Sequence, residues 1–226
     1  VHAHVVYGIP VRELVSSDDQ GSTPITLQVR LWDSVANHWV DTTFDGSFQS
    51  GSHPARPDIV HGALAFPASG GVTFWDLTAS QSQNRFGVVA GDDRAPLGPP
   101  SFSISDVVVG APHQGLLTVI NGDTVALMPM GAAAPNDPLQ LFFQVRSDQA
   151  RPQVTTTLAV FATSKHVISA RPALQLSYSG ALRAGLTAVQ RGLDVSRFHP
   201  GTYQLNVMIS VPGGATASQH ATVVLH

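Results

Sequence analysis

The stretch Phe198–Ser210 reads FHPGTYQLNVMIS, and it decides the fold class of this 226-residue chain. A Pro-Gly pair precedes a run in which every second residue is large and apolar. A period of two places one set of side chains in a core and the other set in water, as in a half-buried β-strand. We therefore predict a closing hairpin strand with Pro200-Gly201 in the turn. The side chains assigned to the core are Phe198, Tyr203, Leu205 and Val207.

The same alternation recurs along the whole chain, separated by Gly- and Pro-rich breakers such as SGG, PLGPP, NGD, PNDP and PGG. Short strands at intervals of about ten residues are typical of antiparallel β-sandwiches. The sequence therefore predicts an all-β fold. The predicted strands are 25–33, 72–79, 102–109, 139–146, 155–162, 173–180, 203–210 and 217–225.

One segment competes with this pattern, because apolar residues between Leu182 and Leu193 are spaced at three and four, as on a helix. Gly185 and Gly192 lie inside that segment and disfavour a helix. We therefore favour a non-helical structure here.

The chain length suits two tandem immunoglobulin-like sandwiches, since one such domain takes about 100 residues. The predicted boundary lies near residues 110–115, where APHQG provides a Pro/Gly hinge. We thus expect a first sandwich over residues 1–110 and a second over 111–226.

Composition excludes several classes of function. Cysteine is absent, which removes disulfides, thiolate metal sites and thiol nucleophiles. The net charge is −3 with only 12 basic residues, so there is no basic stripe of the kind that nucleic acid requires. No apolar stretch approaches the roughly 20 residues that span a bilayer.

Three segments resemble a known family: VHAHVVYGIPVREL, FSISDVVVG and LDVSRFHPGTYQLNVMISVPGGATASQHATVVL. They are similar to the β-rich C-terminal region of bacterial GWxTD-domain proteins, with its opening strand into Y-x-x-P, its SD strand and its closing PG-x-Y-x-L hairpin. The Gly-Trp-x-Thr-Asp signature itself does not occur in these residues. The resemblance implies a β module of the cell envelope and carries over no catalytic residue.

Histidine provides the strongest case for a metal, with 10 residues in the chain. His2 and His4 would share one face of a strand, and Asp18-Asp19 or His226 would complete a site. A solvated chain end explains the same pattern, and we favour it. The doublets Asp18-Asp19 and Asp92-Asp93 lack the spacing of a calcium loop and read as turns. We predict no metal and no cofactor.

Catalysis has little support in the sequence. There is no G-x-S-x-G motif, and SISD around Ser105 reads as strand alternation with Asp106 at a solvent-facing or turn-capping position. Paired catalytic carboxylates are also improbable, because Glu13 is the single glutamate and the aspartates are almost all turn-like. We expect a protein that is not an enzyme.

Binding remains, and four residues are candidate partner contacts: Trp32, Trp39, Trp75 and His199. Trp32 lies on the polar phase of its strand, one of the Phe74-Trp75 pair must face outward, and His199 lies in a turn. Burial within the protein is the competing explanation for the tryptophans, and a solvated turn is the competing explanation for His199.

Two functions follow from these residues. The first is an accessory subunit that docks on a larger secretory, respiratory or photosynthetic assembly through sandwich edges and loops. Its partners would be protein subunits at the periplasmic or extracellular face of the envelope, with any signal or anchor upstream of these residues. The alternative is an extracytoplasmic carbohydrate- or peptide-binding module using Trp39 or Trp75 as a stacking platform. A flat aromatic pair with nearby Asp, Asn and Gln would favour the sugar, and a broad apolar strip along an edge strand would favour the subunit.

Overall fold

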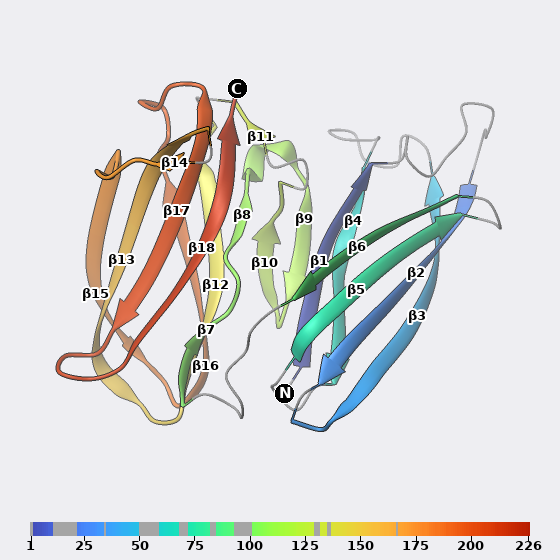
Figure 1. Cartoon of the computed structure of the whole chain (residues 1–226), viewed down its shortest axis with the longest axis horizontal. Helices are drawn as coiled ribbons and strands as arrows, with labels where there is room; N and C mark the ends of the chain where they lie inside the picture. The colour runs from blue at the N-terminus through green and yellow to red at the C-terminus, as the bar shows by residue number, and fades with distance from the viewer. Residues whose placement is uncertain are drawn as a thin grey trace. The chain divides into compact units, whose positions relative to one another are not determined.

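The computed structural model describes residues 2–10, 22–33, 35–49, 59–67, 72–81, 85–92, 101–128, 132–134, 137–165 and 167–226. The chain divides into two compact units, Val1–Pro100 and Ser101–His226. Both are built from strands, and the helical element among the described residues is the short 3₁₀ turn η3 (Pro112–Gln114). None of the described helical structure is long and apolar enough to cross a bilayer. The chain is all-β, with two tandem, predominantly antiparallel β-sandwiches (Figure 1).

The first unit consists of a four-stranded antiparallel sheet in the order β3-β2-β5-β6 and a two-stranded sheet of β1 and β4. Its strands are β1 (His2–Pro10), β2 (Ser22–Asp33), β3 (His38–Gln49), β4 (Ile59–Pro67), β5 (Val72–Gln81) and β6 (Arg85–Asp92).

The core of the first unit lies between these two sheets. Alternate residues of β2 and β5 form its buried center: Ile25, Leu27, Val29, Leu31, Leu77 and Ala79. Side chains of β1 and β4, including Val5, Tyr7, Ile9 and Leu64, pack against them. The period of two in ITLQVRLWD therefore places one face of β2 in the core and leaves the opposite face outside.

The second unit has a larger and a smaller sheet, shown from green to red in Figure 1. The larger sheet contains β11 (Ala132–Ala133), β13 (Arg151–Ser164), β14 (Val167–Ile168), β15 (Leu174–Leu182), β17 (Gly201–Ser210) and β18 (Thr216–Leu225). The smaller sheet contains β7 (Phe102–Ile104), β8 (Val108–Gly110), β12 (Leu139–Ser147) and β16 (Gly185–Leu193). A separate hairpin joins β9 (Leu117–Ile120) to β10 (Asp123–Ala126).

One pairing in the larger sheet is parallel, between the two-residue strand β11 and β18. The other strand pairs recorded in the two units are antiparallel. The second core lies between the sheets, and alternate residues of β12, β13 and β17 dominate it. Phe143, Leu141, Leu205 and Val207 are fully buried within it.

The opening motif is a core strand, as predicted, but Pro200-Gly201 is not the turn of its hairpin. Pro200 precedes β17, Gly201 is the first residue of β17, and the turn that joins β17 to β18 lies between Val211 and Ala215. Tyr203, Leu205 and Val207 of β17 are buried, Phe198 packs against the same core, and β17 forms an antiparallel hairpin with β18. The Tyr203 hydroxyl donates a 2.8 Å hydrogen bond to the His199 carbonyl. A tyrosine at the start of a strand that bonds to backbone a few residues upstream is a feature of immunoglobulin-type sandwiches.

The unit boundary differs from the predicted one by about ten residues, because the first unit ends at Pro100 rather than at residue 110. FSISDVVVG is not the last strand of the first sandwich. Its two parts, β7 and β8, pair with β12 of the second unit. The APHQG hinge is instead η3, inside the second unit, so a Pro/Gly cluster marked a turn rather than a linker.

Between β7 and β8 the chain carries one residue more than the facing part of β12, which is the arrangement of a β-bulge. The Ser105 hydroxyl accepts a 2.9 Å bond from the Gln144 backbone N–H and so replaces a ladder bond. Asp106 is exposed, as predicted, and accepts a 2.6 Å bond from the Gln219 amide.

The helix-like segment contains no helix: β15 ends at Leu182, residues 183 and 184 form a bend, and β16 runs from Gly185 to Leu193. Gly185 has a φ of +94°, a conformation that glycine adopts at little cost. It allows the chain to turn from the edge of the larger sheet into the smaller sheet.

Candidate binding surfaces

Three aromatic side chains gather on the outer face of the four-stranded sheet, at the end nearest the β2–β3 turn. Trp32 of β2 pairs in register with Trp39 of β3 and with Phe74 of β5. The Trp32 and Trp39 ring centroids are 5.5 Å apart with a 61° angle between planes, and those of Trp39 and Phe74 are 5.7 Å apart at 88°. We call Trp32, Trp39 and Phe74 the aromatic cluster.

The aromatic cluster is well placed to bind a ligand because much of it remains in contact with solvent. Trp39 is 48% exposed and Phe74 is 39% exposed, while Trp32 is half-buried between them. Edge-to-face packing fixes the rings relative to one another, so little side-chain entropy is lost when a ligand binds.

Polar side chains continue the same face along the strands away from the aromatic cluster. The next row across the sheet is Asp41, Arg30 and Asp76, since these residues are register partners. Arg30 donates from Nε to both Asp76 oxygens at 3.1 and 2.9 Å, and its Nη2 lies 2.7 Å from Asp76 Oδ2. Hydrogen bonding to the Asp76 side chain is the larger cause, and the negative charge of Asp76 the second, of a pKa of Arg30 above its usual value.

Arg30 also connects the polar row to the aromatic cluster. Its guanidinium carbon lies 5.7 Å from the centroid of Trp39, within cation–π range. Asp76 is buried, and Arg30 neutralises its charge. Asp41 is exposed and accepts from the Gln28 amide at 3.2 and 3.3 Å, and Asp45 accepts from Thr26 at 2.8 Å.

The structure separates the four predicted contact residues. Trp32 and Trp39 lie together on the outer face, but Trp75 packs against the first core. Phe74 therefore supplies the outward ring of β5, which the shared phase of Trp75, Leu77 and Ala79 would have indicated. His199 lies in the second unit with its side chain exposed, and its carbonyl is used by Tyr203.

A second surface lies at one edge of the larger sheet in the second unit. β14 and β15 both pair with β13 on the side opposite β17, and we call this side of the sheet the open edge. The sequence of β15, LQLSYSGAL, contains no charged residue. Its pairing with β13 is regular from Val154↔Gly180 to Val160↔Leu174.

Apolar side chains are exposed along the open edge. One of them, Leu176, lies on the core side of the sheet. Leu176 pairs with buried Leu158, which pairs with buried Val207. Leu176 is nevertheless 43% exposed, on a strand that pairs with β13 on one side only among the described strands. Val167 and Ile168 of β14 are also exposed.

A tyrosine and an arginine lie beside this exposed leucine. Tyr178 of β15 faces the same side as Leu176, and Arg191 of β16 places its guanidinium carbon 4.7 Å from the Tyr178 ring centroid. The Tyr178 hydroxyl is buried without a hydrogen-bond partner in the described structure. The sequence pattern did not reveal this surface, because which strand lies at an edge depends on non-local pairing.

The proposed metal ligands are not brought together in the part of the chain that the structure describes. No group of three or more histidine or acidic side chains suited to a metal occurs there. The side chains of His2 and Asp92 are not described, and Asp18, Asp19 and Asp93 lie outside the described residues. His113 Nε2 lies 2.8 Å from Asp137 Oδ2, a contact that joins η3 to the segment before β12.

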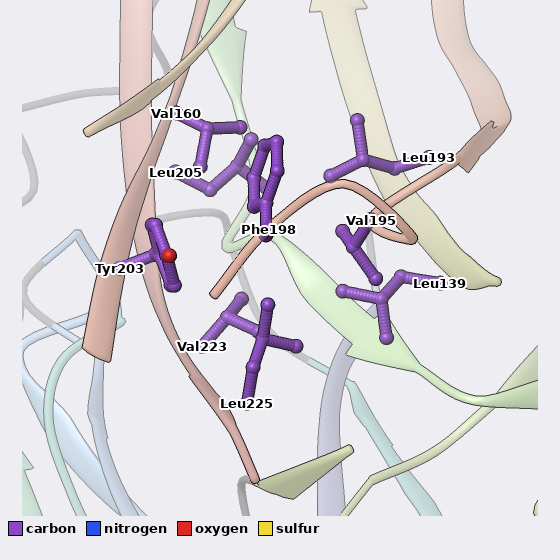
Figure 2. Close-up of a pocket in the computed structure, with 9 residues that line it drawn as sticks. All are labelled: Leu139, Val160, Leu193, Val195, Phe198, Tyr203, Leu205, Val223 and Leu225. Carbon is purple, nitrogen blue, oxygen red and sulfur yellow. The ribbon is translucent and has the colours of Figure 1, made fainter. Parts of the chain in front are cut away.

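The second core contains a cavity of about 10 Å³ beside Phe198 and Tyr203. Figure 2 shows the lining side chains, which are Leu139, Val160, Leu193, Val195, Phe198, Tyr203, Leu205, Val223 and Leu225. A water molecule needs about this volume together with polar partners, and the lining is apolar. The cavity is therefore a packing void and not a ligand site.

Comparison with known proteins identifies no family. No family model matches the chain, and no curated protein matches it. Among solved structures, the C-terminal domain of wzt is similar over 57% of this chain and 75% of its own, with 12% identity and a TM-score of 0.39. Red sea bream transglutaminase (11% identity, TM-score 0.34) is matched over 100% of this chain. A Bacteroides uniformis β-glucuronidase (9% identity, TM-score 0.39) is matched over 99%.

The chain spans only 29% of the transglutaminase and 26% of the glucuronidase. These similarities concern the fold alone.

Proposed function

We propose that this protein is a non-catalytic accessory subunit that docks on a larger assembly of the cell envelope by accepting an extended segment of a partner alongside β15. The observation that carries the proposal is the uncharged open edge of the larger sheet, with Leu176 exposed on its core side. Placement in the envelope rests on the resemblance of the sequence to the β-rich region of GWxTD-domain proteins.

An extended strand is the ligand that fits an edge, because only another backbone can pair with a row of unpaired N–H and C=O groups. Natural edge strands are usually protected by lysines, prolines or bulges. In β15 the irregular pairing with β13 lies beyond Gly180, so residues 174–180 are left regular and uncharged. Seven residues extend about 23 Å at roughly 3.3 Å each, which is enough for a typical strand.

The side chains of an added strand would complete the sandwich as well as the sheet. Residues on the core side of the new strand would cover Leu176 and contact the ring of Tyr178. We therefore expect a partner segment of about six or seven residues that alternates apolar and polar side chains, without charge on the apolar phase.

The test replaces Leu176 by lysine, which places a charge where the partner strand would pack. The matched control is Met208→Lys, because Met208 is 41% exposed in the same sheet but lies on the interior strand β17. Tagged wild type and both variants are extracted from native membranes in mild detergent and analysed by size separation and mass spectrometry.

We expect the wild type and Met208→Lys to migrate with one assembly in stoichiometric amounts, and Leu176→Lys to migrate alone. In the assembly, the β15 amides should also exchange hydrogen more slowly than in the free chain. If the wild type migrates as a free 23.8 kDa particle, or if both variants dock equally well, the proposal is wrong.

A further inference from the structure

We propose that the aromatic cluster of the first unit, with the polar row beside it, is a binding site for a neutral carbohydrate. This site is separate from the open edge of the second unit and does not depend on the proposed docking function. Trp39 would stack against the C–H face of a pyranose ring, and Phe74, whose ring plane lies at 88° to that of Trp39, would contact the edge of the same sugar. Asp41 and Gln28 would accept and donate hydrogen bonds to its hydroxyl groups.

The rings provide a fixed apolar surface at which a sugar would lose little solvation of its hydroxyl groups. Trp39 is held by edge contacts with Trp32 and Phe74, and on one side by Arg30. Nearly half of Trp39 nevertheless remains exposed. A large aromatic surface that is already ordered gives its contact energy at small entropic cost.

The neighbouring polar groups select for hydroxyl donors. Asp41 is exposed, and its carboxylate oxygens accept hydrogen bonds from the Gln28 amide at 3.2 and 3.3 Å. An ionised carboxylate accepts several hydrogen bonds, and those to charged groups are among the stronger ones. Sugar hydroxyls can therefore replace or join the Gln28 bond without leaving a buried charge unpaired.

The charge of the face argues against an anionic ligand. Three carboxylates, those of Asp41, Asp45 and Asp76, stand against the single guanidinium of Arg30 among the described outer side chains of β2, β3 and β5. The cation–π position on Trp39 is already taken by Arg30, which disfavours a cationic peptide. A neutral carbohydrate satisfies both the rings and the acceptors.

The shape of the surface suits a chain of sugars rather than a single one. Residues two apart on a strand are separated by about 6.6 Å, and the outer positions run from Trp32 through Arg30 and Gln28 to Thr26 on β2 alone. Polar rows thus continue for about 20 Å beyond the aromatic cluster. We expect an oligosaccharide to bind more tightly than its monosaccharide.

The experiment titrates the full chain by calorimetry with defined hexasaccharides: maltohexaose, cellohexaose, mannohexaose and xylohexaose. Hexagalacturonate serves as the anionic probe and hexalysine as the cationic probe. The variants are Trp39→Ala and Asp41→Ala, and the matched control is Val119→Ala, an exposed apolar position in the second unit. Circular dichroism verifies that each variant is folded, and Asp41→Ala, at an exposed position, keeps the test valid if Trp39→Ala does not fold.

We expect at least one neutral hexasaccharide to bind, with the affinity reduced about tenfold or more by Trp39→Ala and by Asp41→Ala and unchanged by Val119→Ala. The docking variant Leu176→Lys should bind sugar normally, so failure of the docking proposal and failure of this one are distinguishable. The proposal is overturned if no neutral hexasaccharide binds at millimolar concentration, if only hexagalacturonate or hexalysine binds, or if the aromatic and acidic variants bind as well as the wild type.

Discussion

Truncation of Leu205 to alanine should remove a large part of the stability of the second unit. Leu205 is 0% exposed in the center of β17, where it contacts the core and lines the existing cavity. Leucine-to-alanine changes at such sites cost about 2.7–5.0 kcal/mol, and the cost rises with the volume of the cavity by about 24 cal/mol per Å³.

We therefore expect Leu205→Ala to lower the free energy of unfolding by about 3–5 kcal/mol, a large share of the 5–15 kcal/mol typical of a domain. The control is Leu176→Ala, where a 43% exposed leucine on β15 should cost only about 1 kcal/mol.

The assay is equilibrium urea unfolding followed by circular dichroism, with hydrogen exchange of β17 peptides to locate the change. Tryptophan fluorescence follows the first unit, because all three tryptophans belong to it. A loss below about 1.5 kcal/mol in Leu205→Ala, or a loss no larger than that of Leu176→Ala, would refute the assigned core.

Three further predictions concern single residues. Tyr203→Phe should cost about 1 kcal/mol because the bond to the His199 carbonyl is lost, whereas His199→Ala should leave the urea midpoint unchanged. Gly110→Ala should cost about 1–3 kcal/mol or more in the same assay, since the new Cβ would overlap the β10 backbone, while Gly180→Ala, with open space, should not. Hydrogen bonds from Ser196, first from its side chain and then from its backbone, lower the pKa of Asp194. The ionised Asp194 therefore contributes to folding stability above the ordinary carboxyl pKa, and this contribution is lost as the pH falls through the lowered pKa. Urea midpoints measured from pH 6 down to about pH 2 should therefore fall less steeply in Asp194→Asn than in the wild type, and equal slopes would contradict this assignment.

The candidate sites were only partly accessible from sequence. The polar phase of Trp32 placed it outside the core, and that placement is confirmed. The partnership of Trp32 with Trp39 and Phe74 depends on the register of three strands, which a single-strand period does not specify. Trp75 was a candidate because the prediction did not use its shared phase with Leu77 and Ala79, which places it on the core side.

The sequence by itself determined that the chain is a set of β-strands, because the period of two is a local property of each segment. FHPGTYQLNVMIS was assigned to a core strand on this basis, and Tyr203, Leu205 and Val207 are buried as predicted. Turn residues are equally local, and among the described residues the Asn-Gly pair of NGD and the PGG segment lie in turns between strands, as predicted.

The tertiary structure alone decided which strands pair and where each unit begins. FSISDVVVG joined the second unit because β12 offers it a hydrogen-bonding edge, and not because of any signal within its own residues. Likewise, helical spacing between Leu182 and Leu193 was overridden by pairing of β15 with β13 and of β16 with β12. Backbone pairing and burial are non-local, so the open edge and the aromatic cluster exist only once the strands are assembled.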